Sequence, residues 1–119
     1  MFATMITIYH NPRCSTSRNT LALIREQGHE PQVVEYLKTP LNAQQLAKLI
    51  SDAGLSVRQA MRAKEAVYAE LNLADPSLSD EQLLQAMEAN PILLNRPFVT
   101  TPKGTRLVRP TIDVVRDIL

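Results

Sequence analysis

The sequence of 119 residues predicts an α/β fold with a four-stranded mixed sheet and helices packed on it. Three observations lead to this prediction. The chain opens with the pattern of a strand, a helix and a second strand, which implies a parallel pair joined by a crossover. A helical insertion follows over about residues 41–90. The chain then ends with two short strands joined by a turn and a last helix, so the expected order is β-α-β, insertion, β-β-α.

The first strand is expected over Met5–Tyr9, a run of apolar and β-branched residues that the turn residues Asn11-Pro12 end. A helix should follow at once. The hydroxyls of Ser15–Ser17 can accept hydrogen bonds from the unpaired N–H groups of a first helical turn. The only cysteine, Cys14, would therefore lie at a helix N-terminus.

The position of Cys14 at a helix N-terminus affects the reactivity of its thiol. The partial positive charge and free N–H groups of a helix start favour both a thiolate and a bound oxyanion. Arg13 and Arg18 flank the cysteine in sequence. We therefore expect the pKa of Cys14 to lie below the value of about 8.5 of a free thiol. The alternative is a buried, inert cysteine, which the polar surroundings disfavour.

The next elements follow from turn signals. Gly28 should end the first helix with a left-handed cap, and Gln32–Leu37 is the pattern of a second strand that Pro40 closes. Three helix starts are then expected where a capping residue precedes a glutamine by three positions, as in a capping box. They are Asn42 with Gln45, Ser56 with Gln59 in a helix continuing through Leu71, and Ser79 with Gln82 in a helix running to about Ala89.

The last third of the chain returns to strands. Phe98–Thr100 and Thr105–Val108 are expected to form a hairpin around the turn Pro102–Gly104. Thr111 should cap the final helix. The complete order resembles the thioredoxin-like fold, in which the first strand-to-helix turn, here the turn at Cys14, holds a reactive thiol.

Composition narrows the class of protein. A hydrophobic fraction of 45%, 21% charged residues, and 13 basic against 12 acidic side chains are typical of a globular protein without a strong field for nucleic acid or membrane. We expect residues 1–119 to form a single domain and a monomer. No apolar run is long enough for a secretory signal or a spanning helix, and one cysteine cannot form an internal disulfide, so a cytoplasmic location is expected.

Two other chemistries of cysteine are disfavoured. Two histidines and one cysteine do not make a zinc site, although His10 and Cys14 lie close in sequence, so neither a metal nor a bound cofactor is expected. A cysteine phosphatase loop would place an arginine six residues after its cysteine. That position is Thr20 here, and Arg18 comes at four.

The segment Ile8–Leu21 closely resembles the active-site turn of the glutaredoxin-coupled arsenate reductase family. The resemblance extends in the same order across nearly the whole chain. It includes Pro40, Ser56–Arg58 with Arg62, Tyr68–Leu71, Asn90–Leu93, Asn95–Pro97 and Arg109-Pro110.

This resemblance implies an enzyme that reduces arsenate to arsenite, with glutathione as co-substrate and glutaredoxin as reductant. Cys14 would be the nucleophile, and the planar, permanently charged forks of three arginines would hold the oxyanion. By this resemblance the three arginines that hold the oxyanion are Arg62, Arg96 and Arg109. The family's histidine near the thiol matches His10, and two residues of its anion-binding turn match Ser17 and Arg18. Pro97 matches a cis-proline beside the thiol.

Alternatives remain at this point. The chain could be a glutathione-dependent thiol reductase of another substrate, or a non-enzymatic regulator that binds RNA polymerase. A related regulator group has the same fold but typically a Cys-x-x-Cys switch, whose second position is Ser17 here. His10 could also be a strand-end histidine bonded to backbone, and Arg58, Arg106 and Arg116 are expected to be solvated surface charges.

Overall fold

The computed structural model describes residues 5–119, so the first four residues of the expected single domain lie outside the described part. The chain divides into two compact units. One contains the chain up to Thr39 together with Arg96–Leu119, and the other is Pro40–Asn95. The second unit corresponds to the insertion that the sequence predicts over about residues 41–90.

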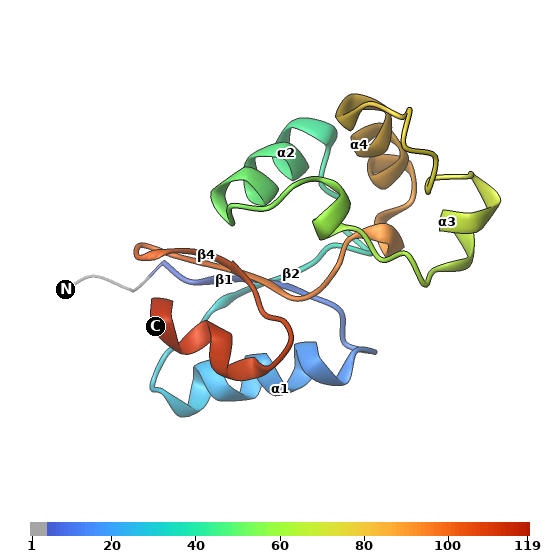
Figure 1. The fold of residues 1–119 in the computed structure, drawn as a ribbon. Helices are drawn as coiled ribbons and strands as arrows, with labels where there is room; N and C mark the ends of the chain where they lie inside the picture. The colour runs from blue at the N-terminus through green and yellow to red at the C-terminus, as the bar shows by residue number, and fades with distance from the viewer. Residues whose placement is uncertain (1–4) are drawn as a thin grey trace. The chain divides into compact units, whose positions relative to one another are not determined.

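The first unit is built on the mixed sheet that the sequence predicts (Figure 1). Its strand order is β2-β1-β3-β4, with β1 parallel to β2 and antiparallel to β3, and with β3 and β4 paired as a hairpin. The first strand begins later than expected, because Met5 is 74% exposed and unpaired in the sheet. The strands are β1 (Thr7–His10), β2 (Gln32–Glu35), β3 (Phe98–Thr101) and β4 (Gly104–Leu107).

Two helices cover one face of this sheet, α1 (Ser15–Glu26) and η3 (Ile112–Ile118) (Figure 1). Gly28 has a φ of 87° and follows α1 as the expected left-handed residue. The final element is a 3₁₀ helix, and the predicted cap is wrong: Thr111 stands at its N-cap position without a side-chain capping bond. The core between helices and sheet consists of Ile6, Ile8, Leu23, Ile24, Val99, Val108, Val115 and Ile118.

The second unit is helical. Both predicted capping boxes at its ends are confirmed, in Asn42 with Gln45 and in Ser79 with Gln82. No helix in residues 5–119 has the length and apolar character needed to span a membrane. The elements are α2 (Ala43–Asp52), η1 (Arg58–Ala60), α3 (Ala66–Glu70), α4 (Asp80–Ala89) and η2 (Pro91–Leu93).

The continuous helix expected from Ser56 through Leu71 is wrong. Ser56 and Gln59 do exchange the predicted bonds, at 3.2 and 2.8 Å, but only the short η1 follows. The backbone then leaves the helical path to pair with a later segment. Met61 forms a β-bridge with Leu94, the N–H of Arg62 donates to the carbonyl of Leu93 at 2.8 Å, and the N–H of Asn95 donates to Ala60 at 2.8 Å.

Candidate active site

The turn before α1 is held by its own backbone and by one buried asparagine. The N–H of Cys14 donates to the carbonyl of Asn11 at 3.0 Å, and the N–H of Arg13 donates to Asn11 Oδ1 at 3.0 Å. Asn11 is only 2% exposed, so this asparagine is a fixed part of the scaffold. Cys14 is the N-cap residue of α1, as predicted, and its side chain is half-buried.

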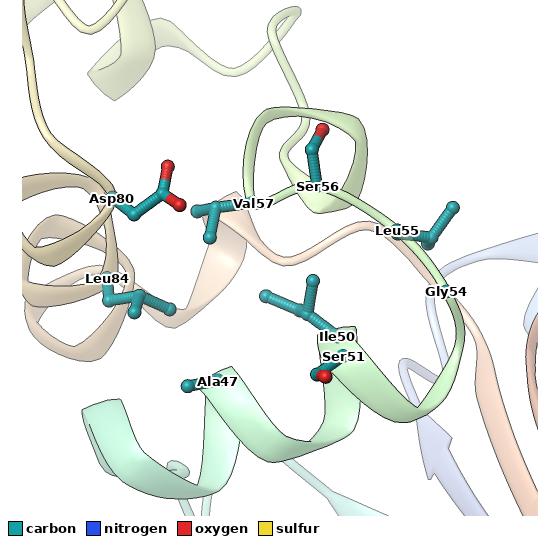
Figure 2. A pocket seen from close by; sticks show the side chains of 9 residues that line it. All are labelled: Ala47, Ile50, Ser51, Gly54, Leu55, Ser56, Val57, Asp80 and Leu84. Atoms are coloured by element: carbon teal, nitrogen blue, oxygen red, sulfur yellow. The ribbon is translucent and has the colours of Figure 1, made fainter.

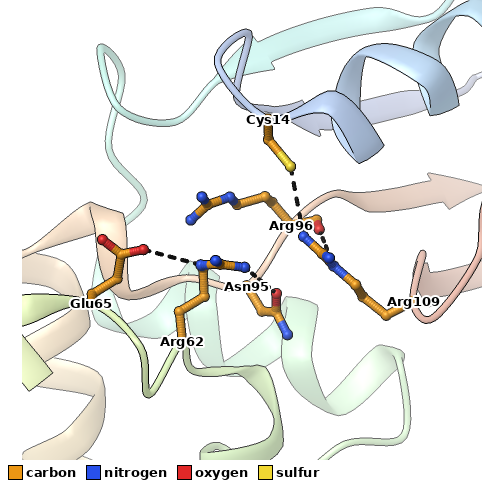
Figure 3. A network of polar contacts seen from close by, with 6 residues as sticks. All are labelled: Cys14, Arg62, Glu65, Asn95, Arg96 and Arg109. Carbon is orange, nitrogen blue, oxygen red and sulfur yellow. Dashed lines mark hydrogen bonds and ion pairs between the residues drawn. The ribbon is translucent and has the colours of Figure 1, made fainter.

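Two arginines that flank the β3–β4 hairpin act on the thiol, and Figure 3 shows the contact of Arg109 with it. Arg109 Nη2 lies 3.6 Å from Cys14 Sγ, and Arg109 Nε donates to the carbonyl of Arg96 at 2.8 Å. Arg96 precedes β3 by two residues and Arg109 follows β4 by two, so antiparallel pairing brings both to one edge of the sheet. The expected cis bond before Pro97 is present, and a second one, which the sequence did not predict, precedes Pro110.

These neighbours determine the charge of the thiol. Burial by itself would raise the pKa of Cys14. The backbone N–H of Ser17, a hydrogen bond from Arg96 and the positive charges of Arg96 and Arg109 act against burial and together lower the pKa below its ordinary value. The site therefore favours the thiolate, which is the nucleophilic form of cysteine.

His10 and Ser17 form a buried pair behind this turn. His10 is 6% exposed and Ser17 is fully buried, and His10 Nδ1 lies 2.6 Å from Ser17 Oγ. Ser17 Oγ also accepts the N–H of Asn11 at 3.1 Å. The prediction that the Ser17 hydroxyl caps α1 is therefore wrong. This hydroxyl is bonded to His10 and Asn11 at the end of β1, and only the backbone N–H of Ser17 bonds to the thiol.

The surroundings of His10 favour the neutral imidazole. Burial is the main cause of its lowered pKa, and the charges of Arg25 and Arg18 act in the same direction. Glu35 opposes them. Arg18 itself is exposed and donates from Nη1 to the carbonyl of Pro12 at 2.8 Å, so its charge stays beside the turn.

Arg62 belongs to the second unit, where two partners hold its side chain. Its Nε donates to Glu65 Oε2 at 3.1 Å and its Nη1 to Asn95 Oδ1 at 3.5 Å (Figure 3). The side chains of Arg62 and Glu65 are 21% and 24% exposed, so this ion pair is largely shielded from water. Neither Glu65 nor Asn95 had a predicted role in the site, although Asn95 lies in the family-like segment Asn95–Pro97.

The arginines expected to be surface charges differ from one another. Arg116 is exposed and paired with Asp113 at 2.8 Å, as predicted. The prediction is wrong for Arg58, whose Nη1 and Nη2 donate to the carbonyls of Leu73 and Asp75 at 2.9 and 2.6 Å. Arg106 is half-buried and donates to the carbonyl of Thr105 at 3.0 Å.

The second unit contains a cavity of about 440 Å³ that sequence reasoning did not predict (Figure 2). Side chains of α2 and α4 form two of its walls, and Asp80 is the only charged residue among those that line it. Its lining includes neither a cysteine nor an arginine, so it offers none of the thiol and guanidinium chemistry found around Cys14.

A sequence model of the ArsC family matches residues 9–116. The chain belongs to the ArsC family. An arsenate reductase of Rhizobium meliloti (strain 1021) is 62% identical over 114 residues, which are 96% of this chain and 81% of that protein. One of Escherichia coli is 54% identical over 96% of this chain and 80% of its own length.

Solved structures agree with this assignment. The arsenate reductase of Vibrio cholerae superposes with a TM-score of 0.95 at 46% identity, covering 99% of this chain and 100% of that one. A structure from Yersinia pestis gives 0.87 at 52% identity, covering 93% and 98%. The predicted thioredoxin-like α/β fold is thereby confirmed, and the family match includes every residue of the chain from His10 to Arg109.

Proposed function

We propose that this ArsC-family protein is an arsenate reductase that uses the Cys14 thiolate as nucleophile and takes its electrons from glutathione and glutaredoxin. The observation that carries the proposal is the contact of Arg109 with Cys14 Sγ at 3.6 Å beside Arg96. A thiolate and two guanidinium groups at a helix start form an anion site with its own nucleophile. Relatives at 50–62% identity are arsenate reductases, which supports the substrate.

Arsenate suits such a site because it is a tetrahedral oxyanion that is doubly charged near neutral pH. Arginine stays charged and donates paired hydrogen bonds to the edges of an oxyanion. We assign the oxyanion to Arg62, Arg96 and Arg109. For Arg62 the support is its motif position and the two bonds that hold its guanidinium within its own unit.

The reaction then proceeds in four steps. The Cys14 thiolate attacks arsenic, an As–S bond forms, and one oxygen leaves as water after protonation. Glutathione adds a second As–S bond with loss of another water. A glutaredoxin thiolate attacks the glutathione sulfur, so that two thiols become one disulfide and As(V) becomes As(III). Water then releases arsenite and regenerates the Cys14 thiol.

The remaining residues of the turn support the nucleophile in this proposal. His10 fixes the Ser17 hydroxyl, and the backbone N–H of Ser17 is thereby aimed at Cys14 Sγ. Arg18 adds positive charge at the entrance of the turn while bonded to Pro12. These groups hold the thiolate and the incoming anion in place, which is the main contribution that fixed dipoles make to such a reaction.

A coupled assay tests the proposal. NADPH oxidation is followed in the presence of glutathione, glutaredoxin and glutathione reductase, with and without arsenate. We expect arsenate-dependent oxidation with the wild-type protein, none with Cys14→Ser, and wild-type rates with the surface variant Arg116→Ala. Absence of arsenate-dependent oxidation in the wild type would contradict the substrate assignment and favour a thiol reductase acting on another compound.

A further inference from the structure

A second cavity lies in the first unit, at the turn that leads into Cys14. It has a volume of about 240 Å³. The turn residues before the cysteine form one wall and the end of β2 with the residues after it forms the other, because both parallel strands end at the same edge of the sheet. Its lining consists of Asn11, Pro12, Arg13, Glu35, Leu37 and Lys38.

The charges around this cavity are of both signs. Arg13 and Lys38 are exposed cations, and among residues 5–119 the guanidinium of Arg13 has no ion-pair partner. Glu35 is the single anion, 37% exposed, with Lys38 Nζ at 3.5 Å from its Oε1. Leu37 is 38% exposed and adds an apolar wall. A ligand with both an ammonium and a carboxylate on a short aliphatic chain matches this lining.

We propose that this cavity binds the γ-glutamyl end of glutathione during the reaction with Cys14. The inference rests on the proposed function, which requires an external thiol at this cysteine. The γ-glutamyl end has an α-ammonium for Glu35 and an α-carboxylate for Arg13 and Lys38, with a methylene chain for Leu37. The glycyl end has only a carboxylate, which would face Glu35 with a like charge.

The size of the cavity supports binding of one end only. Sites that enclose a whole small molecule usually have about 300–1,000 Å³. At about 240 Å³ this cavity holds part of the tripeptide and leaves its cysteine outside. Because residues 11–13 form the wall and lead directly into Cys14, the bound thiol starts its attack beside the reactive sulfur.

A thiol-exchange experiment without arsenic tests the subsite. The single cysteine is converted to a mixed disulfide with 2-nitro-5-thiobenzoate. An added thiolate attacks Cys14 Sγ, a new S–S bond forms, and the coloured thiolate leaves. The probes are glutathione, γ-glutamylcysteine and cysteinylglycine. Each rate is divided by the rate of the same thiol with a small aromatic disulfide, which removes differences in thiol reactivity.

We expect γ-glutamylcysteine to match glutathione and cysteinylglycine to react about fivefold more slowly, since an exposed ion pair contributes up to about fivefold in affinity. Glu35→Gln and Arg13→Ala should slow glutathione and leave cysteinylglycine unchanged. Glu30→Gln and Arg116→Ala, on exposed surfaces elsewhere, are the matched controls. Comparing the probe thiols within one variant also removes any effect that Glu35 has on His10, because that effect is the same for every thiol.

Equal normalised rates for the three thiols, or equal slowing of all three by Glu35→Gln, would overturn the subsite. A preference for cysteinylglycine over γ-glutamylcysteine would do the same, because it would assign the glycyl end. None of these results depends on arsenate. If the arsenate assay fails but the γ-glutamyl preference is present, only the arsenate assignment is rejected. If arsenate is reduced but the three thiols show no γ-glutamyl preference, only the subsite is rejected.

Discussion

Arg109 and Cys14 lie 95 positions apart in the chain, and yet Arg109 Nη2 approaches Cys14 Sγ to 3.6 Å. The same guanidinium donates to the carbonyl of Arg96 at 2.8 Å, which fixes its plane. The contact therefore links the start of α1 to the β3–β4 hairpin through a charged group.

Arg109→Ala should raise the pKa of Cys14 and weaken arsenate turnover. A hydrogen bond to a charged group contributes about 1.5–3 kcal/mol, so a loss of about 10- to 100-fold in kcat/KM is expected. Iodoacetamide alkylation against pH measures the thiol directly, and the wild-type midpoint should lie below about 8.5. Arg116→Ala is the control. A midpoint that is the same in Arg109→Ala and wild type would contradict the role of this contact.

Arg96→Lys should lower arsenate turnover by about tenfold or more, although the charge is kept. An ammonium lacks the planar pair of donors that an arginine presents to an oxyanion. Steady-state kinetics against arsenate concentration measures the effect, and Arg116→Lys serves as the matched replacement at an exposed position of η3. Wild-type kinetics in Arg96→Lys would mean that only its charge matters.

The free energy of unfolding should decrease as the pH falls below about 6.5, because of His10. The folded state holds its pKa below the unfolded value of about 6.5, so the unfolded state binds more protons between these two values. The contribution of His10 to the free energy of unfolding is complete above about pH 6.5. It is lost as the pH falls towards the lowered pKa, at up to about 1.4 kcal/mol per pH unit. Urea unfolding from pH 5 to 8 measures it. His10→Gln should flatten the slope, and an unchanged slope would contradict the assignment.

Arg58→Ala should reduce the free energy of unfolding by about 1–3 kcal/mol, because it removes both donors to the carbonyls of Leu73 and Asp75. Arg25→Ala is the comparison, since its ion pair with Glu30 is exposed and should contribute about 0–1 kcal/mol. Denaturant titration of both variants measures the two losses in the free energy of unfolding. Equal, small losses would restore the view of Arg58 as a surface charge.

Thioredoxin with its reductase should sustain little or no turnover in the absence of glutathione. Cys14 is the only thiol, and Ser15 and Ser17 stand where a second cysteine could have attacked an adduct. An external thiol must therefore release the product. The coupled assay with each reductant system measures this, and intact mass should show a glutathione adduct on Cys14 after oxidative challenge. Full activity with thioredoxin alone would exclude the monothiol mechanism.

The sequence predicted those features that short-range signals determine. The two capping boxes of α2 and α4, the left-handed Gly28 and the position of Cys14 at the start of α1 all depend on residues within a few positions of one another. The hairpin was also predictable, and it brings Arg96 and Arg109 to one edge.

Long-range pairing explains what the sequence did not reveal. The capping pair at Ser56 is real, but the bridge from Met61 to Leu94 ends the helix that this pair begins. Arg58 is bound by carbonyls 15 and 17 positions away, which no local pattern signals. The cavity at Arg13 and Glu35 likewise depends on two strand ends meeting across the crossover.

The groups that surround Cys14 come from distant parts of the chain, and this has a consequence during synthesis. Ribosomes release the N-terminal part first, so β1, α1 and β2 emerge long before the β3–β4 hairpin. Until that hairpin pairs with β1, Cys14 lacks Arg96 and Arg109, two of the groups that lower its pKa. The nascent polypeptide thus exposes a cysteine of more ordinary reactivity, and full acidity of the thiol arises only once translation has delivered the last strands.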